Sequence, residues 1–519
     1  MNRPTEIHRP WLWTVLLSAM ATAVVVSELS PALFPVKSDE LVVAWMGKQA
    51  AAGRAPYADF FCVVPPLTVY GLAAVFKAFG ASLAIFRAVT LVWLLGITLV
   101  LERLFLLAKM PRPWAAASAF LFPGLFLTFW PVPSHHWFAL GFGLSSLWAS
   151  LVAGERRSPF LWFASGTLTA CAGLCLQTEG VLFAALLVLS MALLGTKPFD
   201  RVSVFAALLG LMVPLGAFAG IVTYQGSMGR AFYCLVTWPA TYYKQPGGFN
   251  DLDILTSIAQ EFSSRSPSRM ADLPVFASFL VTLGAACWAP VSLAFSPKWT
   301  SPADGDGAWR RWLFSLLAWS ATTAVFLGGR AEWVHLTMFV TVMVASAFFE
   351  ISWTTERVRP VVFKILVSVG LAVSASLWIG VWSRRPPLLS DIAGVDALVA
   401  KNSVPSILRE LPSVNGRPPA VVFLPHGADL YFFWAPEPPP VDWVDPPSFK
   451  YNAPWEFEAL ASFLERRPIP YVLIQGDFAA MFLGEPSPIQ RVLRERYRPL
   501  RKTPLGLVLE RVPHAAPTS

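Results

Sequence analysis

The sequence predicts an α-helical polytopic membrane protein with a small α/β domain at its C-terminal end. Three observations lead to this fold class. The 519 residues are 55% hydrophobic and only 14% charged, with a mean hydropathy of +0.54. Apolar runs long enough to cross a bilayer recur through residues 1–383. Residues 384–519 instead alternate short apolar runs with polar and proline-rich stretches, which is typical of a soluble domain.

A membrane-spanning helix needs about twenty apolar residues, and the chain offers about eleven such segments. Clusters of Lys and Arg separate alternate segments, and the positive-inside rule assigns those loops to the cytoplasm. The N-terminus is therefore expected in the cytoplasm and residues 384–519 outside. The first run also resembles a signal peptide, but its apolar character continues past the candidate cleavage sites, which favours a retained helix. The predicted spans are 11–29, 84–107, 113–130, 135–153, 159–177, 179–195, 202–224, 273–295, 311–328, 333–351 and 360–382.

In the C-terminal domain, apolar runs predict buried strands and amphipathic stretches predict helices. Strands are expected at 421–424, 471–474 and 505–509, and helices at 455–467 and 488–497. A domain of roughly 130 residues is large enough to fold by itself.

Charge and cysteine content exclude several classes of protein. The net charge of +8 does not indicate nucleic-acid binding, because the basic residues fall in short clusters between apolar runs. The chain has no glycine-rich loop of the kinds that hold a nucleotide phosphate. Three of the five cysteines lie inside predicted spans as small apolar side chains. Cys62 and Cys234 would both face an oxidising compartment and could pair as a disulfide. Free thiols are nevertheless the favoured expectation, because the five cysteines are scattered along the chain.

The polar residues best suited to chemistry follow the first predicted span. Asp39 and Glu40 come directly after Ser38. Carboxylates at a membrane surface are costly unless they are solvated or serve chemistry, and an Asp can take a proton from a hydroxyl group as a general base. The alternative is a polar loop in which Ser38 caps a helix whose first turn holds the acids.

Two proline-containing motifs and two short helices complete this predicted outer loop. The motifs are Pro56-Tyr57-Ala58-Asp59 and Pro65-Pro66-Leu67. The segments near 40–52 and 66–79 are amphipathic, and such helices can lie in the plane of the membrane interface.

This order of parts resembles the first outer loop of GT-C fold integral-membrane glycosyltransferases. Within that fold it is most similar to the bacterial family of ArnT-like and lipid A galacturonosyltransferase-like enzymes, which are related to dolichyl-phosphate-mannose-protein mannosyltransferases. The resemblance covers residues 1–383, and it covers the C-terminal domain only in general character. It implies a sugar donor linked to polyprenyl phosphate and a lipid, glycan or protein acceptor at the outer face of the bacterial inner membrane.

The resemblance also implies roles for individual residues. Transfer would invert the anomeric centre, with Asp39 as the base that deprotonates the acceptor hydroxyl. Glu40 is expected to orient Asp39 or the acceptor. Asp59 is a second candidate acid, or equally a residue that caps a turn.

Apart from the resemblance, Arg330 follows Gly328 and Gly329 at the outer end of a predicted span. It is expected to bind the donor phosphate through its guanidinium fork, with His335 as a hydrogen-bond donor. The alternative is an Arg that anchors the end of a helix.

Four further residues are candidates for acceptor or sugar binding, and three of them mark departures from the family. His135 and His136 occupy the second outer loop, where relatives often carry an acid. Glu179 lies between the fifth and sixth spans, where relatives often show a Lys, and Tyr57 belongs to the first-loop motif. No cofactor or metal site is predicted, although Glu332 and His335 have the spacing to share a divalent cation.

Two other functions remain as alternatives. A surface-polysaccharide polymerase or ligase would use similar chemistry. A transporter of lipid-linked sugars, or a non-catalytic partner in export, would also be polytopic. Transporters, however, tend to place charges at the membrane midplane, whereas the acids of this chain gather at one membrane face. That distribution favours interfacial chemistry.

Overall fold

The computed structural model describes most of the membrane region and parts of the C-terminal domain. The described residues are 10–31, 38–107, 110–127, 131–194, 200–242, 359–384, 388–398, 411, 419–424, 454–467, 469–475, 488–503 and 506–512, and for Ser38 and Asp39 the backbone alone is described. The spans predicted at 273–295, 311–328 and 333–351 lie outside these residues, as do Arg330, Glu332 and His335. The chain forms two compact units.

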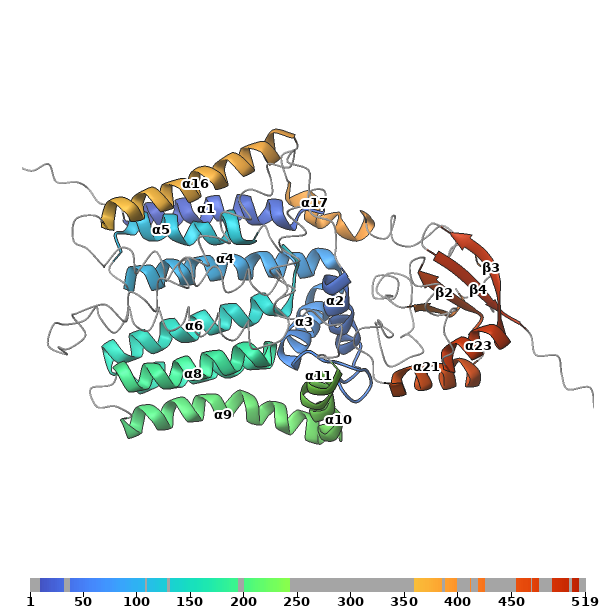
Figure 1. Cartoon of the computed structure of the whole chain (residues 1–519). Helices are drawn as coiled ribbons and strands as arrows, with labels where there is room; N and C mark the ends of the chain where they lie inside the picture. The colour runs from blue at the N-terminus through green and yellow to red at the C-terminus, as the bar shows by residue number, and fades with distance from the viewer. Residues whose placement is uncertain are drawn as a thin grey trace, which may run out of the picture. The chain divides into compact units, whose positions relative to one another are not determined.

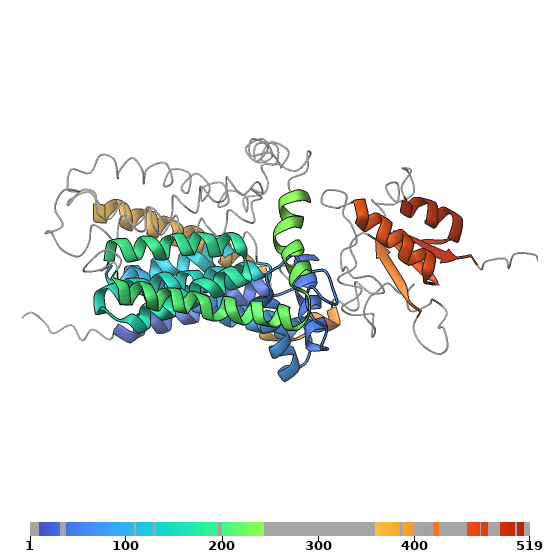
Figure 2. The same ribbon diagram turned by 90° about the horizontal axis from the view of Figure 1, so that it is seen from below.

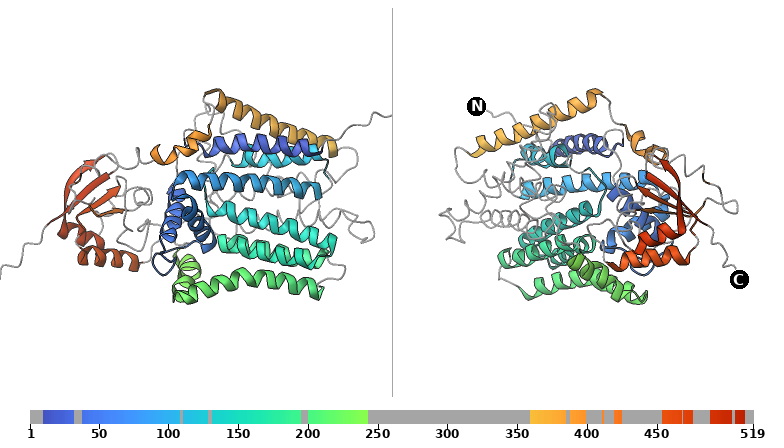
Figure 3. Two further views of the ribbon diagram at one scale, coloured as in Figure 1. Left: turned by 180° about the vertical axis from the view of Figure 1, so that it is seen from behind. Right: turned by 45° about the vertical axis from the view of Figure 1, so that its right-hand side comes forward.

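The first unit is a helical bundle, and several of its helices lie side by side with nearly parallel axes (Figures 1 and 3). Successive helices reverse direction, because short loops join neighbouring spans. Its helices are α1 (Pro10–Leu29), α4 (Leu83–Leu107), α5 (Arg112–Leu121), the π-helical turn η1 (Phe122–Phe126), α6 (His135–Arg156), α7 (Pro159–Cys175), α8 (Gln177–Leu194), α9 (Arg201–Tyr224), α16 (Arg359–Arg384) and α17 (Leu389–Ala393). The first residues of α4 and the last of α9 belong to the second unit.

Length and composition of these helices fit a membrane protein. Among the described residues, α1, α4, α6 and α9 are long and apolar enough to cross a membrane. In α9 only 11% of the apolar window is buried, and Phe205, Leu208 and Met212 are exposed. An apolar surface of this kind suits contact with lipid. The predicted α-helical membrane fold is confirmed.

Small and hydroxylated residues hold the bundle together. Lipid is as apolar as Leu, so helices associate through close packing and hydrogen bonds between helices. A Cβ atom added to Gly166 of α7 would collide with the carbonyl oxygen of Ala207 in α9, and one added to Gly210 would collide with the carbonyl oxygen of Phe163. The hydroxyl of Ser146 lies 2.7 Å from that of Thr169.

A buried acid fixes one end of the bundle. Glu102 of α4 is fully buried. It accepts a hydrogen bond of 3.0 Å from the hydroxyl of Thr14 and lies 3.8 Å from Nε of Arg112. Arg112 also donates to Thr14 at 2.8 Å. This network joins α1, α4 and α5, and it satisfies a charge that would otherwise be expensive to bury.

The predicted span 113–130 is not a regular α-helix over its described length. α5 ends at Leu121 and continues as η1. Pro123 lacks the N–H that an α-helix needs and crowds the preceding turn, which accounts for the change of winding. Ser374 and Trp378 of α16 then donate hydrogen bonds to the carbonyl of Gly124 at 3.0 and 3.1 Å.

The second unit contains the helices of the first loop and the C-terminal domain. Its helices are α2 (Ser38–Ala51), α3 (Pro66–Phe79), α10 (Met228–Phe232), η3 (Tyr233–Thr237), α11 (Trp238–Tyr242), α21 (Pro454–Arg466) and α23 (Pro488–Arg496), and its strands are β1 (Val421–Leu424), β2 (Tyr471–Gln475), β3 (Tyr497–Thr503) and β4 (Gly506–Arg511). Figure 2 shows α10, η3 and α11 as one continuous helical segment.

The four strands form one sheet in the order β1-β2-β4-β3. β1 and β2 are parallel, and the other two pairings are antiparallel. Alternate strand residues such as Val472 and Ile474 form a core with Leu460 of α21 and Val492 of α23. Phe61 of the first loop packs against the same core.

Strand β3 was not predicted from the sequence. The stretch 497–503 is polar and contains a proline, and all but its first and last residues are exposed. It is an edge strand, and the register shifts between Pro499 and Arg501. Edge strands tolerate proline and charge, because one side of their backbone makes no ladder.

Candidate active site

The acidic pair lies at the start of helix α2. The amphipathic pattern expected near 40–52 is not seen, because nearly all side chains from Glu40 to Ala50 are buried. α2 begins at Ser38, so Asp39 and Glu40 occupy its first turn. The N–H groups of a first turn have no partner within the helix, and the helix dipole favours negative charge there. Glu40 is fully buried. A first-turn carboxylate can accept hydrogen bonds from these N–H groups, and a general base must likewise accept a proton.

The Pro56–Phe60 stretch forms a tight turn with an unusual backbone. Tyr57 has φ of 68°, which is rare for a bulky residue. Its N–H donates to the carbonyl of Phe60 at 3.0 Å. Its hydroxyl donates to the carbonyl of Val64 at 2.9 Å, and its ring is fully buried. Burial raises the pKa of Tyr57 well above its usual value. While it donates to Val64, this hydroxyl can contact a sugar only by accepting a hydrogen bond.

Asp59 closes the same turn. Its Oδ2 accepts a hydrogen bond of 2.6 Å from the N–H of Ala55, and its own N–H donates to the carbonyl of Ala55 at 2.9 Å. Arg54 donates to the carbonyl of Asp59 at 2.6 Å. Asp59 is exposed. These bonds give the carboxylate a turn-capping role, which was one of the two interpretations left open by the sequence.

The segment after α9 packs against the first loop within the second unit. Arg230 donates to the carbonyl of Ala58 at 3.0 Å, and Gln225 donates to the hydroxyl of Tyr70 at 3.1 Å. The rings of Phe61 and Trp238 meet edge to face at 5.5 Å. The first loop and the segment that follows α9 therefore pack together.

Cysteines of this region are free thiols. Cys62 and Cys234 are both buried, and neither forms a disulfide. The thiol of Cys62 donates to the carbonyl of Val64 at 3.2 Å, and burial raises its pKa to about 12. Among the described residues, no three His, Cys, Asp or Glu side chains gather as a metal-binding set.

In the first unit, four helix ends bring further candidates to the same end of the bundle. Figure 1 shows that α1 ends where α4, α6 and α8 begin. Arg87, near the start of α4, is buried and donates to the carbonyl of Leu29. Glu28 lies in the last turn of α1, and Glu179 lies in the first turn of α8.

The two histidines are fixed at the start of α6. Ser134 caps the helix by accepting a hydrogen bond from the N–H of His136 at 3.4 Å. The imidazole rings of His135 and His136 lie 4.2 Å apart at an angle of 33°. His135 is half-buried and His136 is buried. Their neighbour Trp137 donates to the carbonyl of Val132 at 3.0 Å, which holds this turn in place.

Glu28 and Glu179 differ from Glu102 in one respect. All three are buried, at 0%, 2% and 0% exposure respectively. Within the described structure, neither carboxylate oxygen of Glu28 or Glu179 has a hydrogen-bond partner. Isolated buried carboxylates are costly, and acids inside membrane segments mark functional sites by default. Sequence reasoning missed Glu28, although an acid in the last turn of an apolar run was a signal that could have found it.

No family model matches the chain, and no curated protein matches it. Solved structures do. The crystal structure of ArnT from Cupriavidus metallidurans bound to undecaprenyl phosphate has a TM-score of 0.55 and 11% identity over 97% of this chain and 98% of that one. The apo form of the same protein has a TM-score of 0.43 and 12% identity over the same shares.

The oligosaccharyltransferase of Archaeoglobus fulgidus in its apo form has a TM-score of 0.46 and 13% identity, over 100% of this chain and 76% of that one. The likeness to the lipid-bound ArnT defines the class of architecture. The fold is the GT-C fold, of the ArnT-like kind, as the first-loop motifs predicted. At this identity the likeness concerns the fold alone.

Proposed function

We propose that this chain is a membrane glycosyltransferase that uses a polyprenyl-phosphate sugar. The observation that carries the proposal is the acidic first turn of α2, placed directly after α1 in a GT-C fold that matches over 97% of the chain. The ArnT of that match was crystallised with undecaprenyl phosphate, which supports a polyprenyl-phosphate donor. Sugar transfer needs a base, an anion-binding group for the leaving phosphate and hydrogen-bonding groups for hydroxyls, and the chain offers candidates for each.

In the proposed reaction, Asp39 takes the proton of an acceptor hydroxyl. The acceptor oxygen forms a bond to the anomeric carbon as the bond from that carbon to the phosphate oxygen breaks. The lipid phosphate leaves as an anion, so it needs stabilisation of charge rather than a proton. Arg330, with His335, supplies that stabilisation. Glu40 orients Asp39 or the acceptor, and the configuration at the anomeric carbon inverts.

The unpartnered acids of the helical bundle are proposed to contact the substrates. Glu28 and Glu179 accept hydrogen bonds from hydroxyl or amino groups of the substrates. Such hydrogen bonds contribute about 0.5–1.5 kcal/mol each and would offset part of the cost of burying these polar groups. His135 and His136 lie at the same end of the bundle, and they are proposed to contact the acceptor or the sugar.

The first test is a comparison of envelope glycolipids and glycoproteins by mass spectrometry. Strains would carry the intact gene, a deletion, or the deletion complemented with the Asp39→Asn variant. We expect one sugar modification to disappear in the deletion strain and to stay absent with the variant. Restoration by the variant would instead favour a transporter or assembly partner.

In the purified enzyme, Arg330→Lys should raise the apparent KM for the polyprenyl-phosphate donor, because an ammonium cannot copy the guanidinium fork. Unchanged donor saturation in Arg330→Lys and Arg330→Ala would remove Arg330 from the site.

The proposed site faces outward. Arg103, Arg112, Arg156 and Arg201 lie at the opposite end of the bundle from Glu28, and the positive-inside rule places that end in the cytoplasm. A reporter that is active only outside the cytoplasm, fused after Val512, should therefore be active. Activity of a cytoplasm-only reporter at the same position would reverse this orientation and exclude an outward-facing site.

A further inference from the structure

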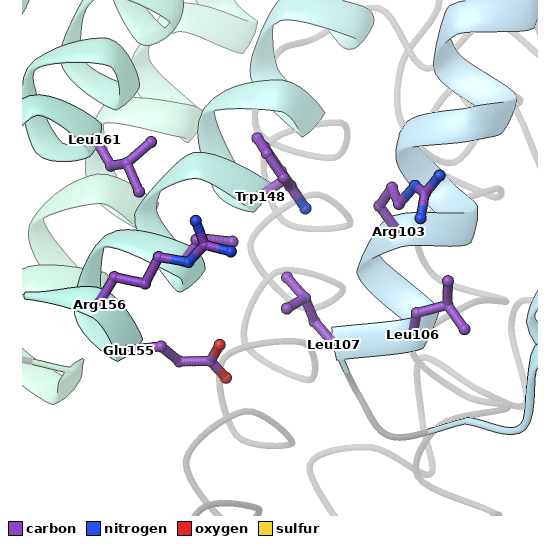
Figure 4. Close-up of a pocket in the computed structure, with 8 residues that line it drawn as sticks. Arg103, Leu106, Leu107, Trp148, Glu155, Arg156 and Leu161 are labelled. Carbon is purple, nitrogen blue, oxygen red and sulfur yellow. The ribbon is translucent and has the colours of Figure 1, made fainter. Parts of the chain in front are cut away.

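A pocket lies at the end of the bundle opposite Glu28, where α4 and α6 end and α7 begins (Figure 4). Its volume is about 300 Å³. That value is at the lower end of the range for small-molecule sites, so it suits a compact group rather than a whole lipid or a sugar chain. The lining residues are Arg103, Leu106 and Leu107 of α4, Trp148, Val152, Glu155 and Arg156 of α6, and Leu161 of α7.

The pocket carries two cations, Arg103 and Arg156, that have no partner among the described residues. Within the described structure, neither Arg103 nor Arg156 has a hydrogen bond or an ion pair, whereas Arg112 at the same end is paired with Glu102. In Figure 4 the two guanidinium groups lie on either side of Trp148. Two arginines and one glutamate leave the lining with a net charge of +1. The exposed Arg157, directly after Arg156, adds to the positive charge.

The remaining walls are apolar. Leu106, Leu107, Val152 and Leu161 provide aliphatic surface, and Trp148 is half-buried. A free inorganic anion gains nothing from such walls. A phospholipid does, because its phosphate can meet the arginines while its glycerol and first methylene groups lie on the leucines. Indole rings and arginines also prefer the depth of the lipid headgroups.

The position of the pocket along the bundle agrees with that depth. α4 and α6 have 25 and 22 residues, so each is long enough to reach from one membrane surface to the other. The lining residues come from their last turns, and basic residues gather at this end. Basic pockets between membrane helices on the cytoplasmic side bind anionic headgroups.

We propose that this pocket binds the headgroup of an anionic phospholipid from the cytoplasmic leaflet through Arg103 and Arg156. The site is separate from the proposed transferase site and lies at the other end of the bundle. The lipid would hold α4 against α6 and α7 at a point where the described protein offers no direct polar contact between the arginines and a partner.

The test uses native mass spectrometry of the full-length protein with phosphatidylglycerol, phosphatidylcholine and inorganic phosphate as probes. The variant is Arg103→Ala/Arg156→Ala. The matched control is Arg157→Ala/Arg201→Ala, which removes the same charge from exposed positions at the same end but outside the pocket. Each arginine in direct contact with the lipid phosphate contributes a factor of about five, so the pocket variant should bind phosphatidylglycerol about 25-fold more weakly. The control should change binding by less than about threefold.

Three results would overturn the proposal. The first is equal affinity of the wild type and the pocket variant for phosphatidylglycerol. The second is an equal loss in the control, which would assign the effect to general surface charge. The third is binding of inorganic phosphate or phosphatidylcholine as tight as that of phosphatidylglycerol, which would mean a simple anion site or a site without charge selection. Both variants alter exposed side chains, and equal thermal unfolding would confirm that they are folded.

Discussion

Replacement of Asp39 by Asn should lower sugar transfer on the order of 100-fold or more, with normal membrane insertion and purification. The amide is nearly the same size as the carboxylate, but it cannot take a proton from the acceptor hydroxyl. Asp39 lies in the first turn of α2, where the loss of negative charge costs about 0.3–1 kcal/mol, too little to prevent folding. The measurement is the turnover of a polyprenyl-phosphate sugar by the purified protein at saturating donor.

Asp59→Asn is the matched control for this substitution. The carboxylate of Asp59 accepts a hydrogen bond of 2.6 Å from the N–H of Ala55, and the amide oxygen of Asn can accept the same bond. Turnover should therefore stay within about threefold of the wild type. Near-normal turnover in Asp39→Asn would place the base elsewhere. Equal losses in the two variants would show that the loop responds to charge in general, and not to a base at Asp39.

The second large effect concerns two buried glutamates of the bundle that differ in their partners. Glu28→Leu should leave thermal stability unchanged or raise it, while transfer falls about 10- to 100-fold. Leu fills a similar volume and removes a carboxylate that has no hydrogen-bond partner in the described structure. Burial of a polar group without a hydrogen bond costs about 1–3 kcal/mol, so its replacement by a well-packed apolar residue is expected to be neutral or stabilising. The loss of transfer follows from the missing acceptor for a substrate group.

Glu102→Leu should instead lower the stability of the protein. Glu102 has the hydroxyl of Thr14 at 3.0 Å and Nε of Arg112 at 3.8 Å, so its removal leaves those groups without their acceptor. The free energy of unfolding is expected to fall by about 1–3 kcal/mol. The loss should lie at the lower end of this range, because the Arg112 side chain is 26% exposed. Unfolding in detergent and donor turnover are measured for both variants. A Glu28→Leu protein that is less stable and fully active would make Glu28 a structural residue.

Much of the fold followed from local patterns in the sequence. The spans predicted at 11–29, 84–107, 202–224 and 360–382 match α1, α4, α9 and α16 closely. A bilayer imposes a minimum length on an apolar run, so composition alone defines such helices. The strands β1, β2 and β4 could also be predicted from the sequence, because their apolar runs are short and contiguous.

Two features of the fold were not predicted from the sequence, and each has a physical cause. β3 pairs at an edge, where burial does not select apolar residues, so its composition resembles a loop. The π-helical turn at Phe122–Phe126 depends on how Pro123 disturbs the winding of one helix. Neither feature has a periodicity that a sequence pattern can reveal.

By itself, the sequence determined that the chain spans a membrane, that its acids begin a helix after the first span, and that an α/β domain follows the last span. These properties depend on the length, spacing and local propensity of neighbouring residues. Only the tertiary structure decided that Glu28 has no hydrogen-bond partner among the described residues, whereas Glu102 has a hydrogen bond from Thr14 and an ion pair with Arg112. It also decided that Asp59 closes a turn and that Arg103 and Arg156 line one pocket. The partner of a polar group lies far away in the chain, and the energy of a buried charge depends on that partner rather than on its sequence neighbours.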